Sequence, residues 1–183
     1  MDTTETGARP PVEIEIADAP EPDQPTVTSA GERLEKVIDG VQVRPAITHS
    51  DERGSLTEMY DPAWGFMDEP LVYVYEARIH PGQKKGWIVH REQDDRLFFA
   101  IGSAKIVLYD ARPSSPTQGL VQEVFLGSAN RGLLRIPAGV VHAVVNVGPE
   151  QVVYINMPTK PYRHDRPDKQ RLPADTTAIP YDL

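Results

Sequence analysis

The chain has 183 residues, of which 39% are hydrophobic, 25% are charged and none is cysteine. This length is enough for one domain with a substantial core, and the absence of cysteine excludes disulfides and thiolate metal sites. Most of the formal net charge of −8 comes from the first 30 residues. The rest of the chain is nearly neutral and has no basic stripe, which argues against nucleic-acid binding.

Residues 1–30 are rich in proline, aspartate and glutamate and are predicted to form a disordered acidic tail, because they cannot bury enough apolar surface. Apolar and acidic residues alternate over 12–16, so this segment could instead add a strand to the edge of a sheet. A short helix is predicted over 31–38, at the start of a single domain spanning 31–183. No apolar run approaches the roughly 20 residues needed to cross a bilayer, so we expect a cytoplasmic protein without membrane partners.

From Val41 onward the chain reads as short strands separated by Gly, Pro, Asp or Asn. Many short strands without intervening helices predict an all-β antiparallel sandwich or barrel. After Met157 the chain becomes polar and rich in proline, and we expect this segment to wrap around the barrel. The predicted strands are 41–43, 47–50, 55–60, 71–79, 96–101, 104–109, 120–126, 133–136, 143–147 and 151–156.

Two histidines lie where such a barrel would hold a site. His142 follows the Pro137–Gly139 turn, and His90 follows the segment Lys85-Gly86-Trp87-Ile88-Val89. Side chains alternate between the two faces of a strand, so Ile88 and His90 are expected to point the same way and Trp87 the other way. The predicted site therefore combines an isoleucine with histidines.

The spacing Pro137-x-Gly139-x-x-His142-x-x-x-Asn146 resembles the second motif of the cupin superfamily, which implies a cupin jelly-roll β-barrel. Within that superfamily, the chain resembles the dTDP-4-dehydrorhamnose 3,5-epimerase family. The further matches are Asp51-Glu52-Arg53-Gly54 with Glu58, Lys85-Gly86, Asp110-Ala111-Arg112 with Ser115 and Gly119, Ile136-Pro137-Ala138-Gly139, and Ala174-Asp175 with Ile179-Pro180.

The resemblance implies an isomerase that works without a metal. In that family a histidine held by an aspartate removes a proton next to a sugar ketone, a lysine stabilises the enolate and a tyrosine returns a proton. The resemblance implies His142, Tyr162 and Asp175 as catalytic candidates, and His90 joins them because of its place on the same strand face as Ile88. The candidates for binding a nucleotide sugar are Arg53, Glu58, Lys85, Ile88, Arg96 and Arg135, with Arg53 and Glu58 reaching across a homodimer interface.

The chain departs from the family at the base, because the alignment puts Ile88 there. The enolate-stabilising lysine falls at Asp95 or Arg96. In one interpretation, His90 replaces the missing base, about 6.6 Å along the same strand face. In a second, His90, His142 and Asp94 or Asp95 bind iron or manganese for an oxygenase or isomerase. In a third, the scaffold serves a cofactor-free cyclase or a ligand-binding protein. We expect no cofactor.

Overall fold

The computed structural model describes residues 23–31 and 34–183, so the 12–16 alternation and most of the predicted tail lie outside the described residues. The chain divides into two compact units, residues 1–35 and 36–183, and the sheets of the described residues belong to the second. The helix expected over 31–38 is not formed by residues 34–38. Ile38 is instead fully buried, and its backbone N–H donates to the side chain of Gln122.

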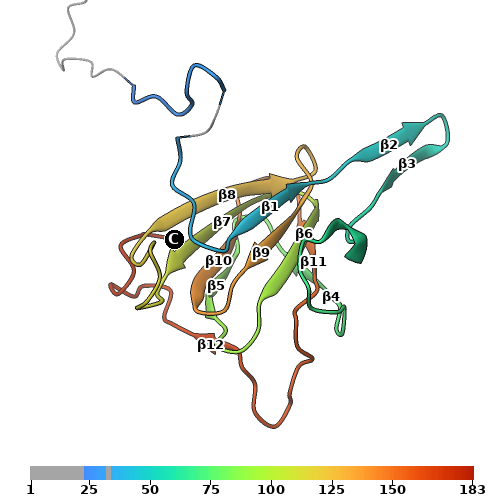
Figure 1. Ribbon diagram of the computed structural model, residues 1–183. Helices are drawn as coiled ribbons and strands as arrows, with labels where there is room; N and C mark the ends of the chain where they lie inside the picture. Colours follow the sequence, from blue (N-terminus) through green and yellow to red (C-terminus); the bar gives the residue numbers. More distant parts are fainter. Residues whose placement is uncertain (1–22, 32–33) are drawn as a thin grey trace, which may run out of the picture. The chain divides into compact units, whose positions relative to one another are not determined.

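The domain is all-β, as predicted, and consists mainly of two five-stranded antiparallel sheets (Figure 1). One has the order β1-β9-β6-β11-β4 and the other the order β12-β5-β10-β7-β8. The strands are β1 (Gln42–Pro45), β2 (Thr48–Asp51), β3 (Gly54–Thr57), β4 (Tyr75–Ile79), β5 (Lys84–Val89), β6 (Asp95–Ile101), β7 (Ser103–Asp110), β8 (Val121–Gly127), β9 (Gly132–Ile136), β10 (Val140–Asn146), β11 (Val152–Asn156) and β12 (Gln170–Arg171), with a 3₁₀ helix, η1, at Pro62–Trp64.

The core lies between the two sheets, where alternate residues of each strand meet. Phe99 and Leu134 enter it from the first sheet, and Ile106 and Leu108 from the second, all at 0% exposure. The opposite face of the second sheet is also buried, because the C-terminal segment brings Ile179 against it. Coverage on both faces explains why these strands read as nearly continuous apolar runs.

The C-terminal segment is irregular, as expected, apart from β12. This two-residue strand pairs with β5, with Gln170 opposite Val89 and Arg171 opposite Ile88. The pairing brings the residues just before β12 next to the end of β5. Among the described residues, no helix is long and apolar enough to cross a membrane.

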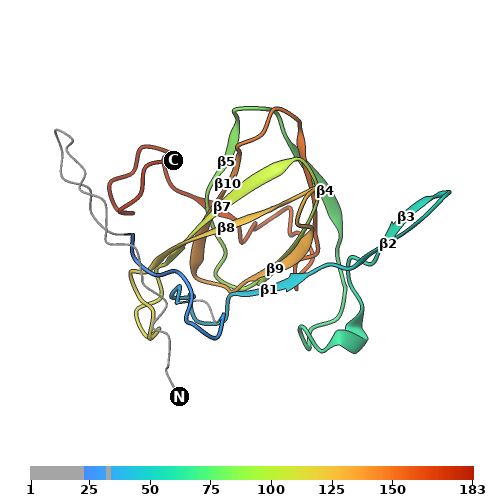
Figure 2. The ribbon, with the colours of Figure 1, turned by 90° about the horizontal axis from the view of Figure 1, so that it is seen from above.

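Strands β2 and β3 form a separate two-stranded hairpin that extends away from the barrel (Figures 1 and 2). Its side chains are largely exposed, including Leu56 at 62%. Ile47, just before β2, is 69% exposed. A two-stranded hairpin is marginally stable alone, and apolar side chains at this exposure gain little from the fold of one subunit.

Candidate functional site

The two histidines approach each other inside the barrel because β5 and β10 are neighbours. His142 lies opposite Ile88 in the register of this pair. The alternation predicted along β5 is confirmed: Trp87 packs in the outer cluster, while Ile88 and His90 line an inner cavity with His142. The rings of His90 and His142 lie nearly parallel, with 6.0 Å between their centroids. Ile88 contributes an apolar wall beside this pair.

The turn before β10 fixes the position of His142, which is the third residue of that strand. Gly139 has φ +83°, and an added Cβ would lie 2.6 Å from Cγ of Arg112, so this position favours glycine. The backbone N–H of Gly139 donates to the carbonyl of His90 at 2.7 Å, and Val140 N–H closes the turn onto Pro137. The turn thus holds the ends of β5 and β10 together.

Asp95 is the carboxylate between the histidines. One of its oxygens lies 3.4 Å from Nε2 of His90 and 3.5 Å from Nε2 of His142. The other accepts hydrogen bonds from Gln93 at 3.1 Å and from Asn156 at 3.2 Å. Because Asp95 is 2% exposed, these contacts are made in a low-dielectric interior where an ionised carboxylate needs partners.

A second carboxylate, Asp168, faces the other nitrogen of His90. Its Oδ2 lies 3.6 Å from Nδ1 of His90. The same carboxylate accepts the backbone N–H groups of Arg91, Glu92 and Gln93 at 3.0–3.2 Å. Burial opposes the charged form, but these backbone donors and the nearby His90 prevail and lower the pKa of Asp168. His90 therefore lies between two carboxylates.

His142 has a different environment, although it shares Asp95. It is 4% exposed, and burial lowers its pKa to about 4 despite the opposing attraction of Asp95. The ring is therefore neutral at neutral pH. Its Nδ1 has only a long 3.4 Å contact with the carbonyl of Val140. His142 borders the inner cavity, whereas His90 borders both this cavity and the larger pocket outside it.

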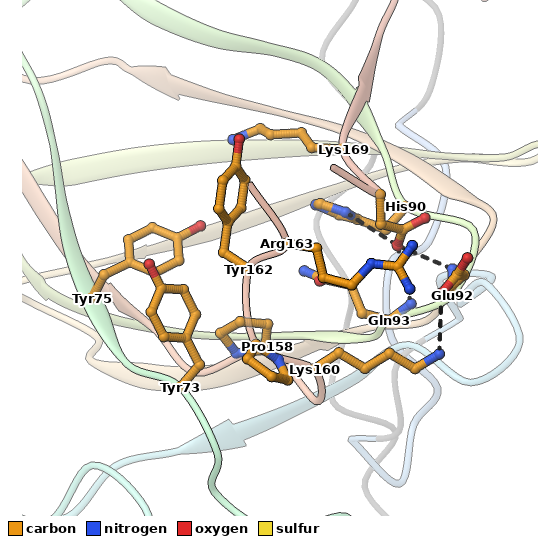
Figure 3. Close-up of a pocket in the computed structure, with 12 residues that line it drawn as sticks. Tyr73, Tyr75, His90, Glu92, Gln93, Pro158, Lys160, Tyr162, Arg163 and Lys169 are labelled. Atoms are coloured by element: carbon orange, nitrogen blue, oxygen red, sulfur yellow. Dashed lines mark hydrogen bonds and ion pairs between the residues drawn. The ribbon is translucent and has the colours of Figure 1, made fainter. Parts of the chain in front are cut away.

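The larger pocket has a volume of about 440 Å³ and opens beside His90 (Figure 3). Tyrosines and prolines from 73–75 and 158–162 form one side, and the loop after β5 forms another. Tyr75 borders both spaces and accepts a hydrogen bond from the Asn156 amide at 2.8 Å. Burial and the charge of Asp95 raise the pKa of Tyr75 to about 12, so its phenol stays protonated at neutral pH.

Positive charges border the same spaces. Lys169 lines the pocket and the inner cavity, and Lys85 lines the cavity. Burial, followed by the positive charge of Arg171, lowers the pKa of Lys169 against the opposing attraction of Asp95. Lys85 also contributes to this shift, which places the three cations within electrostatic reach of one another. The site thus joins carboxylate-held histidines to a set of cations.

Two residues expected to bind substrate have structural partners instead. Arg96 is fully buried, and its guanidinium donates to the carbonyls of Met157, Glu69 and Pro70 and to the Tyr60 hydroxyl. Arg135 pairs with Asp94 at 2.9 Å. Because these groups hold the fold together, we do not place Arg96 or Arg135 at the substrate.

The carboxylate that accompanies the histidines is Asp95, and Asp94 is occupied elsewhere. Asp94 receives two bonds from Arg135 and one from the backbone of Ala138, which anchors the turn before β10. Asp95 begins β6 on the same face as Leu97 and Phe99, which point into the core, whereas Asp94 precedes the strand. The structure resolves this alternative in favour of Asp95.

The remaining predicted site residues are distributed differently. Tyr162 lines the pocket and is 46% exposed. Asp175 is exposed in the turn after β12, and no ion pair joins it to another described residue, so the predicted histidine–aspartate pair is not formed there. Arg53 and Glu58 lie outside the pocket. Arg53 pairs with Asp51 in the hairpin, with its side chain 82% exposed.

Sequence reasoning missed Tyr75, Asn156, Asp168 and Lys169. The inward direction of Tyr75 could have been predicted from the sequence. Ala77 and Ile79 pack in the core, and the period of two along the strand places Tyr75 on the same face. Asp168 and Lys169 lie in an irregular segment with no periodicity. Their placement depends on the pairing of β12 with β5, which no pattern in the sequence predicts.

The donor set could also hold a metal ion. One ligand atom each from His90, Asp95 and His142 lie within 4.8 Å of one another. The separations of 3.4 and 3.5 Å match the edge of a tetrahedron with bonds of about 2.1 Å, the usual metal–nitrogen distance. Two imidazoles and a carboxylate suit iron, manganese or zinc. The nearby Lys85 and Lys169 oppose a further positive charge.

Comparison with known proteins identifies the family. The chain is 36% identical over 147 residues to the spore coat polysaccharide biosynthesis protein SpsL of Bacillus subtilis, which covers 78% of this chain and 94% of SpsL. It is 34% identical over 139 residues to the probable low-salt glycan biosynthesis epimerase Agl13 of Haloferax volcanii, covering 75% and 89%. The chain belongs to the dTDP-4-dehydrorhamnose 3,5-epimerase family.

The solved structures of this family agree with the barrel described above. A dTDP sugar isomerase from Desulfovibrio desulfuricans superposes with a TM-score of 0.74 at 27% identity, over 79% of this chain and 91% of the isomerase. The RmlC epimerase of Mycobacterium tuberculosis shares the fold, with a TM-score of 0.70 at 20% identity over 81% and 76% of the two chains. The chain matches no protein-family model. The barrel of this chain is thus the barrel of the epimerase family.

Proposed function

We propose that this epimerase-family protein inverts a carbon next to the ketone of a nucleotide-linked 4-keto sugar, with His90 as the base. One observation carries the proposal: His90 is the histidine that borders the substrate-sized pocket, and carboxylates face both of its ring nitrogens. The family relationship supports the reaction type, since Agl13 is named as a probable epimerase. Ile88 has no proton to exchange and serves as a wall of the cavity.

The geometry suits proton removal by His90. We assign the proton of the neutral ring to Nε2, where Asp95 can accept it. Nδ1 is buried beside Asp168 and has no hydrogen-bond partner, so it takes the proton from carbon once bound substrate has displaced the side chains that cover it. The positive charge that then forms on the ring is stabilised by Asp95 and Asp168, as a carboxylate stabilises an imidazolium in other histidine pairs.

Inversion also needs an acid on the other face of the planar intermediate. Figure 3 shows Tyr75 and Tyr162 across the pocket from His90. Tyr162 is the candidate that the family resemblance offers for this acid, with its spacing shifted by residues 157–161, and Tyr75 is held by the Asn156 amide with its phenol protonated. Either hydroxyl can return a proton to the face opposite His90. Tyr75→Phe and Tyr162→Phe, measured separately, identify the donor.

The substrate class follows from the family and from the cations at the pocket. A related 3′-monoepimerase of Streptomyces bikiniensis, ChmJ, has been crystallised with dTDP and with dTDP-quinovose. In the present chain, Lys160 and Arg163 line the outer pocket together with Pro158, Pro161 and the tyrosines. Cations and flat apolar surfaces are the features that recognise a diphosphate and a base. A nucleotide sugar satisfies both.

We also propose a homodimer in which the β2–β3 hairpin contacts the partner subunit. The exposed Leu56 and the exposed run 71–74 beside edge strand β4 support this arrangement, because unpaired edges and apolar side chains are stabilised by a second copy. The hairpin would carry Arg53 toward the partner's pocket. Light scattering at micromolar concentration should give twice the chain mass, and a monomer contradicts this proposal.

The reaction is tested by solvent deuterium uptake into a dTDP-4-keto-6-deoxy sugar, followed by mass spectrometry and NMR. We expect uptake by the wild type and a loss of about 100- to 10,000-fold in His90→Ala, the usual contribution of general base catalysis. His80→Ala removes an exposed histidine between β4 and β5 and is the matched control. A wild type that binds thymidine diphosphate but exchanges no proton refutes the proposal.

A metal-dependent isomerase or oxygenase is the second candidate function. The observation that favours it is the convergence of His90, Asp95 and His142 on a space of metal-site dimensions. In that reading His90 is a ligand and cannot act as the base. Elemental analysis together with uptake measured in the presence of a chelator separates the two functions.

A further inference from the structure

The family chemistry requires a cation at the ketone oxygen. In this chain the position of the family's lysine falls at Asp95 or Arg96, and no suitable cation is found there. Of the two residues that fall there, Asp95 is a carboxylate between the histidines, and Arg96 is fully buried among backbone carbonyls. Neither presents a positive charge to the pocket. An enolate next to a base remains costly unless a cation or hydrogen-bond donor faces its oxygen.

Lys169 has the position that such a cation needs. It lines both the pocket and the inner cavity, as His90 does. It lies one residue before β12, whose pairing with β5 sets Gln170 opposite Val89, so Lys169 comes next to His90 at the end of the same pair of strands. Figure 3 shows its side chain extended along the pocket wall from beside His90 toward the tyrosine side.

Lys169 is also a charge without an ionic partner in the described part of the chain. It is partly buried, and no carboxylate there lies within ion-pair distance of its ammonium. In contrast, Lys160, on the same pocket, pairs with Glu92 at 3.5 Å. A partly desolvated ammonium that the protein leaves unpaired gains most from an anion supplied by a ligand.

We propose that Lys169 is the cation that stabilises the enolate oxygen, an inference that rests on the proposed epimerase function. His90 takes the proton from the carbon next to the ketone, the C–H electron pair forms the carbon–carbon double bond, and the carbonyl pair moves onto oxygen. The Lys169 ammonium faces that oxyanion. Return of a proton from tyrosine to the opposite face restores the ketone, and exchange with solvent restores His90 and the phenol.

The alternative anion for Lys169 is the diphosphate of the nucleotide, and the two roles have different kinetic consequences. A contact made to the oxyanion is stronger in the transition state than in the bound substrate, so its loss lowers kcat. A contact to the diphosphate is present throughout, so its loss raises KM and weakens binding of thymidine diphosphate, which has no ketone.

The test compares Lys169→Met, Lys169→Arg and the exposed control Lys36→Met in deuterium uptake, with thymidine diphosphate binding measured by calorimetry. We expect Lys169→Met to lose about 100- to 1,000-fold in kcat, the usual effect of removing one oxyanion donor. KM and thymidine diphosphate affinity should change little, and Lys169→Arg should recover part of the rate. Melting temperatures confirm that each variant is folded.

Uptake that persists in Lys169→Met overturns the inference and leaves the proposed function standing. The same holds if this variant loses thymidine diphosphate affinity while kcat is unchanged, since Lys169 would then bind the diphosphate. Absence of uptake in the wild type overturns both.

Discussion

The substitution Asp168→Asn tests whether a carboxylate from the C-terminal segment holds and activates His90. Asparagine keeps the shape of the side chain and removes its charge. With its carbonyl at the position of Oδ2, it still accepts from Glu92 and Gln93 and leaves the Arg91 N–H facing an amide. One lost backbone hydrogen bond costs about 1–3 kcal/mol, which lowers stability without unfolding the domain.

The effect on catalysis comes from the 3.6 Å separation between Oδ2 of Asp168 and Nδ1 of His90. At an effective dielectric constant of about 20, two unit charges at this distance attract by about 4–5 kcal/mol. Asp95 still faces the other nitrogen, so we take about half of this energy as lost from the transition state. A loss of about 2 kcal/mol corresponds to roughly a 30-fold fall in kcat.

The assay is solvent deuterium uptake into a dTDP-4-keto-6-deoxy sugar, with kcat and KM determined separately and thermal melting measured in parallel. Asp165→Asn, an exposed acid in the same segment, is the matched control and should leave both kinetic constants unchanged. We expect Asp168→Asn to lower kcat with little effect on KM. A folded Asp168→Asn protein with kcat within twofold of the wild type would refute the role assigned to Asp168.

Three further predictions concern stability, substrate contact and metal content. Although burial opposes its charge, hydrogen bonds from Arg112, Ser115 and Thr117 lower the pKa of Asp110, so this carboxylate stabilises the fold fully above its ordinary pKa near 3.8, and the contribution is lost progressively as pH falls from there through the lowered pKa of the folded state. Asp110→Asn should therefore cost about 3–5 kcal/mol in urea unfolding at pH 7 and distinctly less near pH 2; an equal cost at both pH values contradicts this. Arg96→Lys should lower the melting temperature and leave KM unchanged, whereas a large rise in KM would restore Arg96 to the substrate site. Purified protein should contain well below one metal per chain and keep its activity in a chelator, because cations border the histidine cluster; one iron or manganese per chain in elemental analysis would contradict this.

The sequence by itself determined the barrel and the face of β5. Short strands punctuated by Gly, Pro and Asp specify an antiparallel all-β domain, and the period of two places Ile88 and His90 inside and Trp87 outside, as the structure has them. The Pro137–Gly139 turn predicts that a strand carrying His142 follows it. The conformation of this turn is a local property that glycine makes possible. These features depend on residues near one another in the chain.

The tertiary structure alone decided the partners of the histidines. Asp95 and Asp94 are equivalent in the sequence, and only the register of β6 against its neighbours turns Asp95 toward His90 and sends Asp94 to Arg135. Asp168 and Lys169 reach the site through a two-residue strand that pairs with β5 across more than 75 residues of chain. Such a pairing is stabilised by long-range contacts that leave no periodic pattern in the sequence, and for that reason the sequence could supply His90 without its carboxylates or its cation.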